Sequence, residues 1–197
     1  ETLNTWRVDS PKNFCFMLHV RPEISHWLGS AEGDVPEAPE DFPPAVRQAW
    51  DVTLERADAL AARALMIPTG PNFTPGESHR QFLRAFVDIL GEQTDAALIW
   101  EPSGLWTRDQ RVEFADKLGI APVYDPFIAE REEHEFTHGD VAFTITERAG
   151  RRRQYDTFDF KSLIGWTQNY DRVFALLRGR HKWKHAQKMK AALQHTG

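Results

Sequence analysis

The sequence has only one cysteine, Cys15, among its 197 residues, so it holds no disulfide framework. Because Cys15 falls inside an apolar run at residues 14–20, we expect a buried thiol rather than a nucleophile. A reducing, cytoplasmic compartment follows from this cysteine usage. No stretch approaches 18 apolar residues and no basic and then apolar signal pattern opens the chain, so neither a membrane span nor export is indicated.

Glycine-rich phosphate-binding loops are also missing. Spacing of the P-loop or dinucleotide type does not occur, so ATP and NAD are not indicated and no cofactor is assigned. What remains is an ordinary globular composition, with 41% hydrophobic and 27% charged residues. We expect one domain over residues 1–197 with a sizeable core.

Acidic residues are missing from one end of the chain. Residues 172–197 contain seven Lys and Arg and no Asp or Glu. This segment carries +7 and the other residues carry −12, which together give the net charge of −5. Such an end can attract phosphate or nucleic acid, although a solvated helix face is the commoner reason for it.

Six short apolar runs alternate with helix-like stretches along the sequence. This alternation predicts an α/β fold of TIM-barrel-like (β/α) repeats, with a parallel sheet and outer helices. A closed barrel needs eight strands, so we expect either an open sheet or two strands before Glu1. The predicted strands are residues 14–20, 64–67, 96–100, 120–124, 141–146 and 173–177.

Three of the predicted helices have clear sequence signals. Thr74, followed by Pro75 and Glu77, predicts an N-cap, and Gly91 predicts the end of that helix. Residues 107–110 predict a second capping box. The last helix should bury an apolar stripe, formed by Trp183, Ala186, Met189 and Leu193.

The order of several segments resembles the YecE-like family, also known as domain of unknown function 72. The segments are 1–6 (ETLNTW), 11–16 (PKNFCF), 24–26 (ISH), 100–103 (WEPS) with Trp106, and 173–177 followed by 184–186 (KHA). The resemblance covers nearly the whole chain and implies a barrel of the (β/α)₈ type. In that family the stretch similar to 1–6 follows two barrel strands, which implies that the first two strands are missing here.

Polar strand-end residues depart from the pattern of the family. The resemblance implies that His26 and Tyr155 are retained, and so favours an altered or lost family activity. The departures lie at His19 in place of a Lys, Ile99 and Glu101 in place of an acid and an Arg, Thr144 and Thr146 in place of an Arg and a His, and Arg178 with Gly179 in place of two Asn.

Ligands of parallel α/β sheets collect at the carboxyl ends of the strands, where this sequence has several polar residues. An enzyme would use His19 or His26 as acid or base with Glu101 as its partner. His19 with Glu101, Asp125 and Glu147 would also suit a metal, although solvated loop positions are the commoner reason for such residues. A metal-dependent hydrolase or isomerase is therefore an alternative function.

Basic residues near the end of the chain give the preferred hypothesis. Arg178, Arg180 and Lys182 follow the last predicted strand, where barrels commonly hold phosphate. Arg151 and Arg153 follow the preceding strand, and Tyr155 completes the candidate set of ligand-binding residues. We expect an anionic or phosphorylated small molecule to bind there, with surface charge as the competing reason.

Three further sequence patterns allow alternative interpretations of the function. Trp183 could stack on a base of a nucleic acid, but core packing is the more common role for such a residue. The pattern H-E-x-x-H at residues 134–138 suits a zinc peptidase, but a strand begins directly after it and favours a charged loop. His181 and His185 lie four apart, where a solvent- or anion-facing surface is preferred to a metal site. A non-catalytic structural or nucleic-acid-binding domain is the last alternative.

Overall fold

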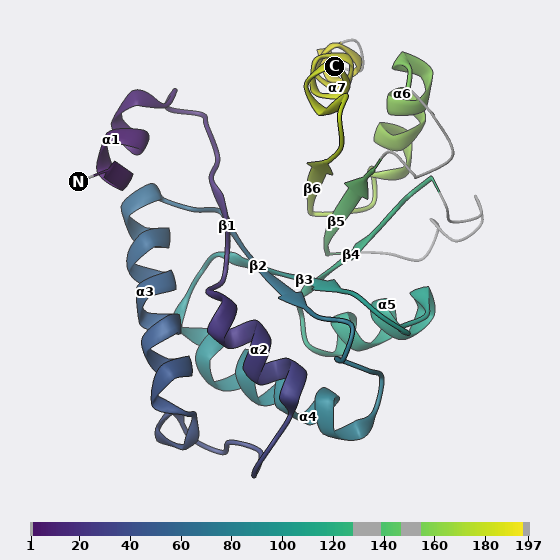
Figure 1. Cartoon of the computed structure of the whole chain (residues 1–197). Helices are drawn as coiled ribbons and strands as arrows, with labels where there is room; N and C mark the ends of the chain where they lie inside the picture. Colours follow the sequence, from purple (N-terminus) through teal and green to yellow (C-terminus); the bar gives the residue numbers. More distant parts are fainter. Residues whose placement is uncertain (1, 128–138, 147–154, 195–197) are drawn as a thin grey trace. The chain divides into compact units, whose positions relative to one another are not determined.

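The structure is a computed structural model that describes residues 2–127, 139–146 and 155–194 (Figure 1). The chain divides into two compact units, one ending at Pro122 and the other beginning at Val123. Six strands follow one another in sequence order, and each is parallel to the next. The predicted parallel α/β fold is thus confirmed. The strands are β1 (Met17–His19), β2 (Ala64–Thr69), β3 (Ala97–Pro102), β4 (Ala121–Tyr124), β5 (Asp140–Ile145) and β6 (Arg172–Leu177).

Among the described residues, a helix follows every strand except β4. Short 3₁₀ turns occur at Pro39–Asp41 and Gly91–Gln93, and a π-helical segment at Phe86–Leu90 extends one helix. None of the described helices is long and apolar enough to cross a membrane. The helices are α1 (Thr2–Asp9), α2 (Pro22–Ser30), α3 (Pro44–Leu60), α4 (Glu77–Ala85), α5 (Arg108–Lys117), α6 (Thr157–Trp166) and α7 (Lys182–Gln194).

The core of the first unit lies between its sheet and helices α2, α3 and α4. Leu65, Ile67 and Trp100 alternate along β2 and β3 and join one hydrophobic cluster with helix residues such as Trp50 and Phe86. Trp50 and Phe86 are each at most 1% exposed. Their burial supplies much of the apolar area that holds this unit together.

The first strand is shorter than the sequence predicts, and this changes the place of Cys15. β1 begins only at Met17, so the segment before it is irregular. Cys15 is exposed, and Phe14 is 49% exposed. The prediction of a buried thiol was therefore wrong, because an apolar run was assigned to the core beyond the residues that pair in the sheet.

The start of helix α4 also differs from the prediction. Gly76, not Thr74, is the N-cap residue, and the Thr74 hydroxyl lies 3.2 Å from His79 Nδ1 instead. Gly91 is the C-cap of the π-helical segment that extends α4, as predicted, although its φ of −63° is not left-handed. A Cβ at this position would lie 2.7 Å from a methyl group of Leu98, so Gly91 permits close packing on β3.

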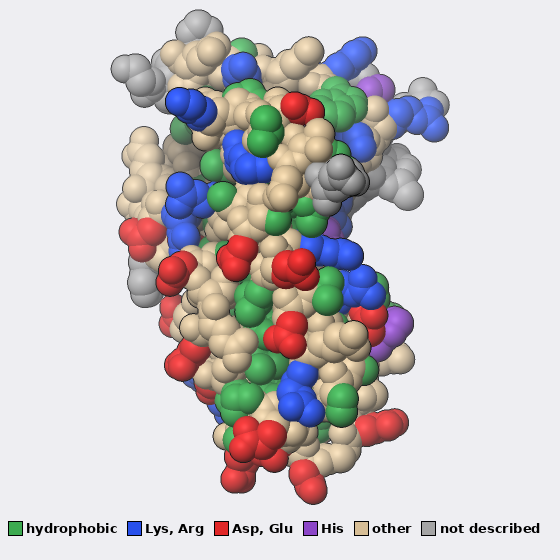
Figure 2. Space-filling model, turned by 90° about the vertical axis from the view of Figure 1, so that its left-hand side faces the viewer, with side chains coloured by type: hydrophobic (Ala, Val, Ile, Leu, Met, Phe, Trp, Pro, Cys, Tyr) green, Lys and Arg blue, Asp and Glu red, His purple; other side chains and the backbone are tan. Residues whose placement is uncertain are grey.

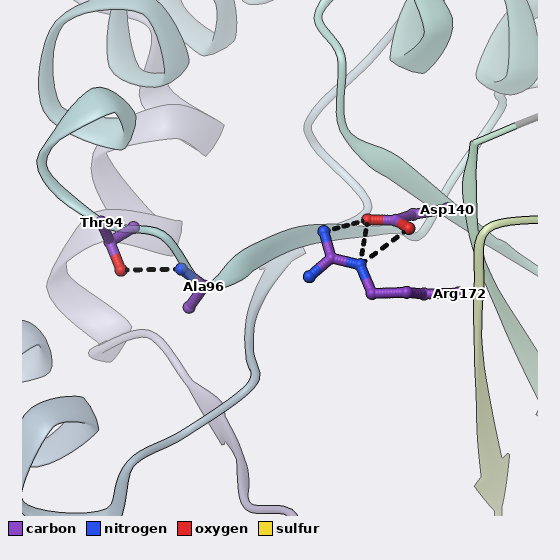
Figure 3. Close-up of polar contacts among 4 residues, drawn as sticks. All are labelled: Thr94, Ala96, Asp140 and Arg172. Carbon is purple, nitrogen blue, oxygen red and sulfur yellow. Dashed lines mark hydrogen bonds and ion pairs between the residues drawn. The ribbon is translucent and has the colours of Figure 1, made fainter.

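Side-chain contacts fix other element ends. Thr107 accepts from the Gln110 amide in the predicted capping box of α5. Asp156 caps α6 in the same way. Ahead of β3, the Ala96 amide donates to the Thr94 hydroxyl over 3.2 Å (Figure 3).

The second unit packs α6 and α7 beside β5 and β6. Val141, Phe143 and Ile145 alternate along β5 and are buried with Phe160 and Leu163 of α6. At the start of these strands, Arg172 forms a forked ion pair with Asp140, with a shortest distance of 2.6 Å (Figure 3). The two residues are register partners, so the pair lies directly across the two neighbouring strands.

The apolar stripe expected on α7 is wrong at Trp183 and Leu193, whereas Met189 does pack against the core of this unit. The buried residues of this helix are His185 and Ala192. Trp183 is 75% exposed and Leu193 is 53% exposed. The helix is therefore rotated relative to the predicted face, because a stripe of spaced apolar residues also fits a face that stays in solvent.

Candidate functional site

The end of β1 holds two candidate catalytic residues, His19 and His26. His19 is the last residue of the strand and His26 lies on α2, and both side chains are exposed. Neither histidine forms a hydrogen bond or an ion pair with Glu101 among the described residues. The structure therefore places the proposed acid and base at separate surface positions.

Register explains why Glu101 is distant from His19. His19 pairs with Met66, which pairs with Ile99, whereas Glu101 pairs with Pro68. Glu101 is thus two strands away and two residues further along, which is roughly 11 Å between Cα atoms in a regular sheet. Sequence reasoning identified the strand ends but not this offset.

The carboxylate next to His26 is Glu23, which the sequence did not single out. Glu23 lies one helical turn before His26, and its Oε1 accepts from Arg21 Nη2 at 2.7 Å. The hydrogen bond from Arg21 is the main reason that the pKa of Glu23 lies below its ordinary value, and the charge of His26 adds a smaller effect. The end of β1 is therefore an exposed cluster of an acid, an arginine and a histidine.

The ends of β2 and β3 are filled by a buried aromatic cluster. Trp100 Nε1 donates to Thr69 Oγ1 over 3.0 Å, and Trp106 Nε1 donates to the Phe73 carbonyl over 2.8 Å. The rings of Trp100 and Trp106 meet edge to face at 4.8 Å. Ser103 donates to the Thr69 carbonyl through both its amide and its hydroxyl. This region has a structural role, which the WEPS and Trp106 pattern could have indicated.

In the second unit, two candidate ligand-binding residues hydrogen-bond to the end of β5. The Tyr155 hydroxyl donates to the Thr146 carbonyl over 3.3 Å, and the Arg178 amide donates to the Ile145 carbonyl over 3.0 Å. Since Ile145 and Thr146 are consecutive, the structure brings Tyr155 and Arg178 to the carboxyl ends of adjacent strands. Tyr155 is only 4% exposed, so its ring belongs to the core.

A line of aromatic rings links Tyr155 to the start of α7. Its ring contacts the ring of His185 at 5.3 Å, and the centroids of His181 and His185 lie 6.3 Å apart. Lys188 of α7 donates a hydrogen bond to the Tyr155 carbonyl over 2.8 Å, which links α7 to the segment before α6. His185 is 1% exposed, so the prediction that it faces solvent or an anion was wrong. Tyr155 and Phe160 cover it instead.

The remaining basic candidates follow β6 and begin α7. Arg180 and Lys182 are exposed, and Gly179 has a φ of +95°, which lets the chain turn sharply between strand and helix. Lys182 Nζ lies 5.9 Å from the centre of the exposed Trp183 ring. The first turn of α7 also presents amide donors that lack acceptors within the helix. We call Arg178, Arg180, Lys182 and Trp183 the β6–α7 basic cluster.

Several sequence candidates lie outside the described residues. They are Arg151, Arg153, Glu147 and the H-E-x-x-H pattern at 134–138. Asp125, the other carboxylate of the suggested metal site, accepts from the Phe127 amide over 3.0 Å and so supports a turn. Within residues 2–127, 139–146 and 155–194, no group of three or more His, Cys, Asp or Glu side chains is arranged to hold a metal.

These observations define a class of fold: parallel strands in sequence order, with a described helix after every strand except β4, as in TIM-barrel-like proteins. In this protein, the basic candidate residues for ligand binding lie between the end of β6 and the first residue of α7.

Solved structures of known proteins share this fold. A DUF72 family protein from Enterococcus faecalis matches with a TM-score of 0.67 and 14% identity, over 98% of this chain and 79% of that one. A DUF72 family protein from Thermotoga maritima also has a TM-score of 0.67, with 13% identity over 95% of this chain and 76% of that one. The fold implied by the sequence resemblance is confirmed. No protein-family model matches the chain, and no curated protein matches it.

Proposed function

We propose that this protein binds a phosphorylated or otherwise anionic small molecule through the β6–α7 basic cluster. Support comes from one observation above all: Arg178, Arg180 and Lys182 are grouped at a strand end and a helix N-terminus, in a segment without any acidic residue. Arginine forks and first-turn amides both suit phosphate oxygens. Such a site needs no catalytic pair, in keeping with the exposed positions of His19 and His26 and the position of the partly buried Glu101 two strands away from His19.

Calorimetric titration tests this proposal with defined probes. We expect inorganic phosphate and ribose 5-phosphate to bind at an ionic strength of about 0.15 M, where distant surface charges are screened, and ribose not to bind. Replacing both Arg178 and Arg180 by alanine should weaken binding tenfold or more, because each charge-assisted hydrogen bond contributes about 1.5–3 kcal/mol.

The control for this titration is Lys161→Ala with Lys190→Ala. This double variant removes the same charge from exposed positions on α6 and α7. It should change affinity by less than about twofold, since screened surface charges at a distance contribute little. Equal weakening in both double variants would reduce the effect to net charge and contradict the proposal.

One observation favours a second candidate, a single-stranded nucleic acid. Trp183 is 75% exposed beside Lys182 and Lys184, which suits stacking on a base while the lysines contact phosphates. Fluorescence anisotropy of a labelled oligonucleotide tests it. Trp183→Ala should weaken binding tenfold or more and Trp183→Phe by less, because stacking contributes about 1–3 kcal/mol per base. Equal binding by all three proteins would exclude this candidate.

A further inference from the structure

A cavity of about 450 Å³ lies in the first unit, away from the strand carboxyl ends. Its lining comes from α1, from the segment before β1 and from the residues between α3 and β2. The cavity therefore lies at the amino ends of β1 and β2, whereas the candidate residues described above lie at the carboxyl ends of the strands. Its size lies within the range of small-molecule sites.

The charge of this cavity has one sign. Three cationic side chains line it, those of Arg7, Lys12 and Arg63, and none of its lining residues is an Asp or a Glu. Ser10 and Asn13 add polar groups to the lining. A concave surface with several cations concentrates small anions, since the low-dielectric walls focus the field.

Arg7 is held in place by the backbone around it. Its guanidinium donates to the carbonyls of Pro11 and Phe14 at 2.9 and 3.0 Å and lies 5.2 Å from the centre of the Phe16 ring. These neutral acceptors fix the group without cancelling its charge. The cation is therefore preorganised, so less conformational entropy is lost when an anion binds.

Figure 2 shows the side of the molecule on which α1 and α3 lie in Figure 1, where basic, acidic and hydrophobic side chains are all visible. Lys12 and Arg63 are exposed, whereas Arg7 is partly buried. We propose that this cavity is a second binding site, for a small molecule that carries two or more negative charges. It is independent of the β6–α7 basic cluster and lies in the other unit.

The chain supplies its own reporter for this site, because Cys15 lines the cavity and is the only cysteine. The uncharged reagent 4,4′-dithiodipyridine reacts with thiols through disulfide exchange. The thiolate of Cys15 attacks one sulfur, a new S–S bond forms to Cys15, the S–S bond of the reagent breaks, and one pyridinethiol is released and measured by absorbance.

Protection of Cys15 is the measurement. Pyrophosphate, at ionic strength held constant with sodium chloride, should slow the reaction at least fivefold and in a saturable way. The double variant Lys12→Ala with Arg63→Ala should lose this protection, while Arg56→Ala with Arg84→Ala, which removes the same charge from exposed sites on α3 and α4, should keep it. Arg7 is left intact because its contacts hold the loop.

Three results would overturn the second site. They are an unchanged rate with pyrophosphate, a fall in rate that does not saturate, and equal loss of protection in both double variants. A free model thiol run in parallel shows any direct effect of pyrophosphate on the reagent. Because the β6–α7 basic cluster remains intact throughout, failure here leaves the calorimetric test of that cluster unaffected.

Discussion

The indole N–H of Trp100 donates a hydrogen bond to the hydroxyl oxygen of Thr69 across 3.0 Å, and both side chains are at most 2% exposed. The pair joins β3 to β2 near their carboxyl ends. A buried donor that loses its acceptor costs about 1–3 kcal/mol of unfolding free energy. This relationship makes Thr69 a structural residue rather than a ligand-binding one.

Thr69→Val should therefore destabilise the protein by about 1–3 kcal/mol in urea unfolding. The matched control is Thr53→Val, at a position that is also 2% exposed but donates locally, to the Ala49 carbonyl within α3. That change should cost less, because the helix already supplies a donor to this carbonyl. Equal losses for the two variants would show that the Trp100 contact contributes nothing specific.

Gly104 should be intolerant of a side chain. Its φ is +107°, and a Cβ there would lie 2.9 Å from the backbone oxygen of Pro71. We expect Gly104→Ala to lower the free energy of unfolding by more than about 2 kcal/mol, from backbone strain and overpacking together. Gly119→Ala is the comparison, since its φ is +64° but no atom lies within 4 Å of the added carbon. A smaller loss at Gly104 than at Gly119 would contradict this reasoning.

The ion pair between Arg21 and Glu23 predicts a pH dependence. Arg21 holds the pKa of Glu23 below its ordinary value, mainly by hydrogen bonding. Because the folded pKa is depressed, the contribution to stability is present above the unfolded pKa of about 4.3 and is lost as pH falls through the folded pKa.

Arg21→Ala should raise the pKa of Glu23 toward its ordinary value, as followed by carboxyl NMR titration. The same variant should destabilise the protein slightly at neutral pH and leave its stability unchanged in strong acid. A titration curve for Glu23 that is identical in the two proteins would refute the assigned cause.

The contact between Asp140 and Arg172 should matter little for stability despite its forked geometry. Arg172 is 53% exposed at its side chain, so water and salt screen the pair. Asp140→Asn should cost less than about 1 kcal/mol of unfolding free energy. A loss above 2 kcal/mol in thermal or urea unfolding would mean that the pair determines strand register.

Strand existence and order could be predicted from the sequence, because β-rich apolar runs such as 141–146 alternate with helical periodicity. The exposure of Cys15 could not, since only pairing with Ala64 decides where β1 begins, at Met17. The rotation of α7 was missed for a related reason: a buried His185, covered by Tyr155, outweighs the apolar spacing of Trp183.

The candidate sites were predicted only in part. The Tyr155 hydroxyl and the Arg178 amide both hydrogen-bond to the carboxyl end of β5, and a shared ligand for the two residues stays a prediction. The cavity around Arg7 was not foreseen, because its residues come from three separate segments and share no motif. Glu23 escaped attention because it lies inside α2 rather than after a strand.

The most direct test of the central claim is an amide NMR titration with ribose 5-phosphate, using the Lys12→Ala and Arg63→Ala variant so that the cavity does not contribute. We expect saturable shifts of the amides of residues 179–184, which are lost when Arg178 and Arg180 are replaced by alanine. Saturable shifts confined to other residues, or none at concentrations that saturate the calorimetric signal, would contradict an anion site at the end of β6.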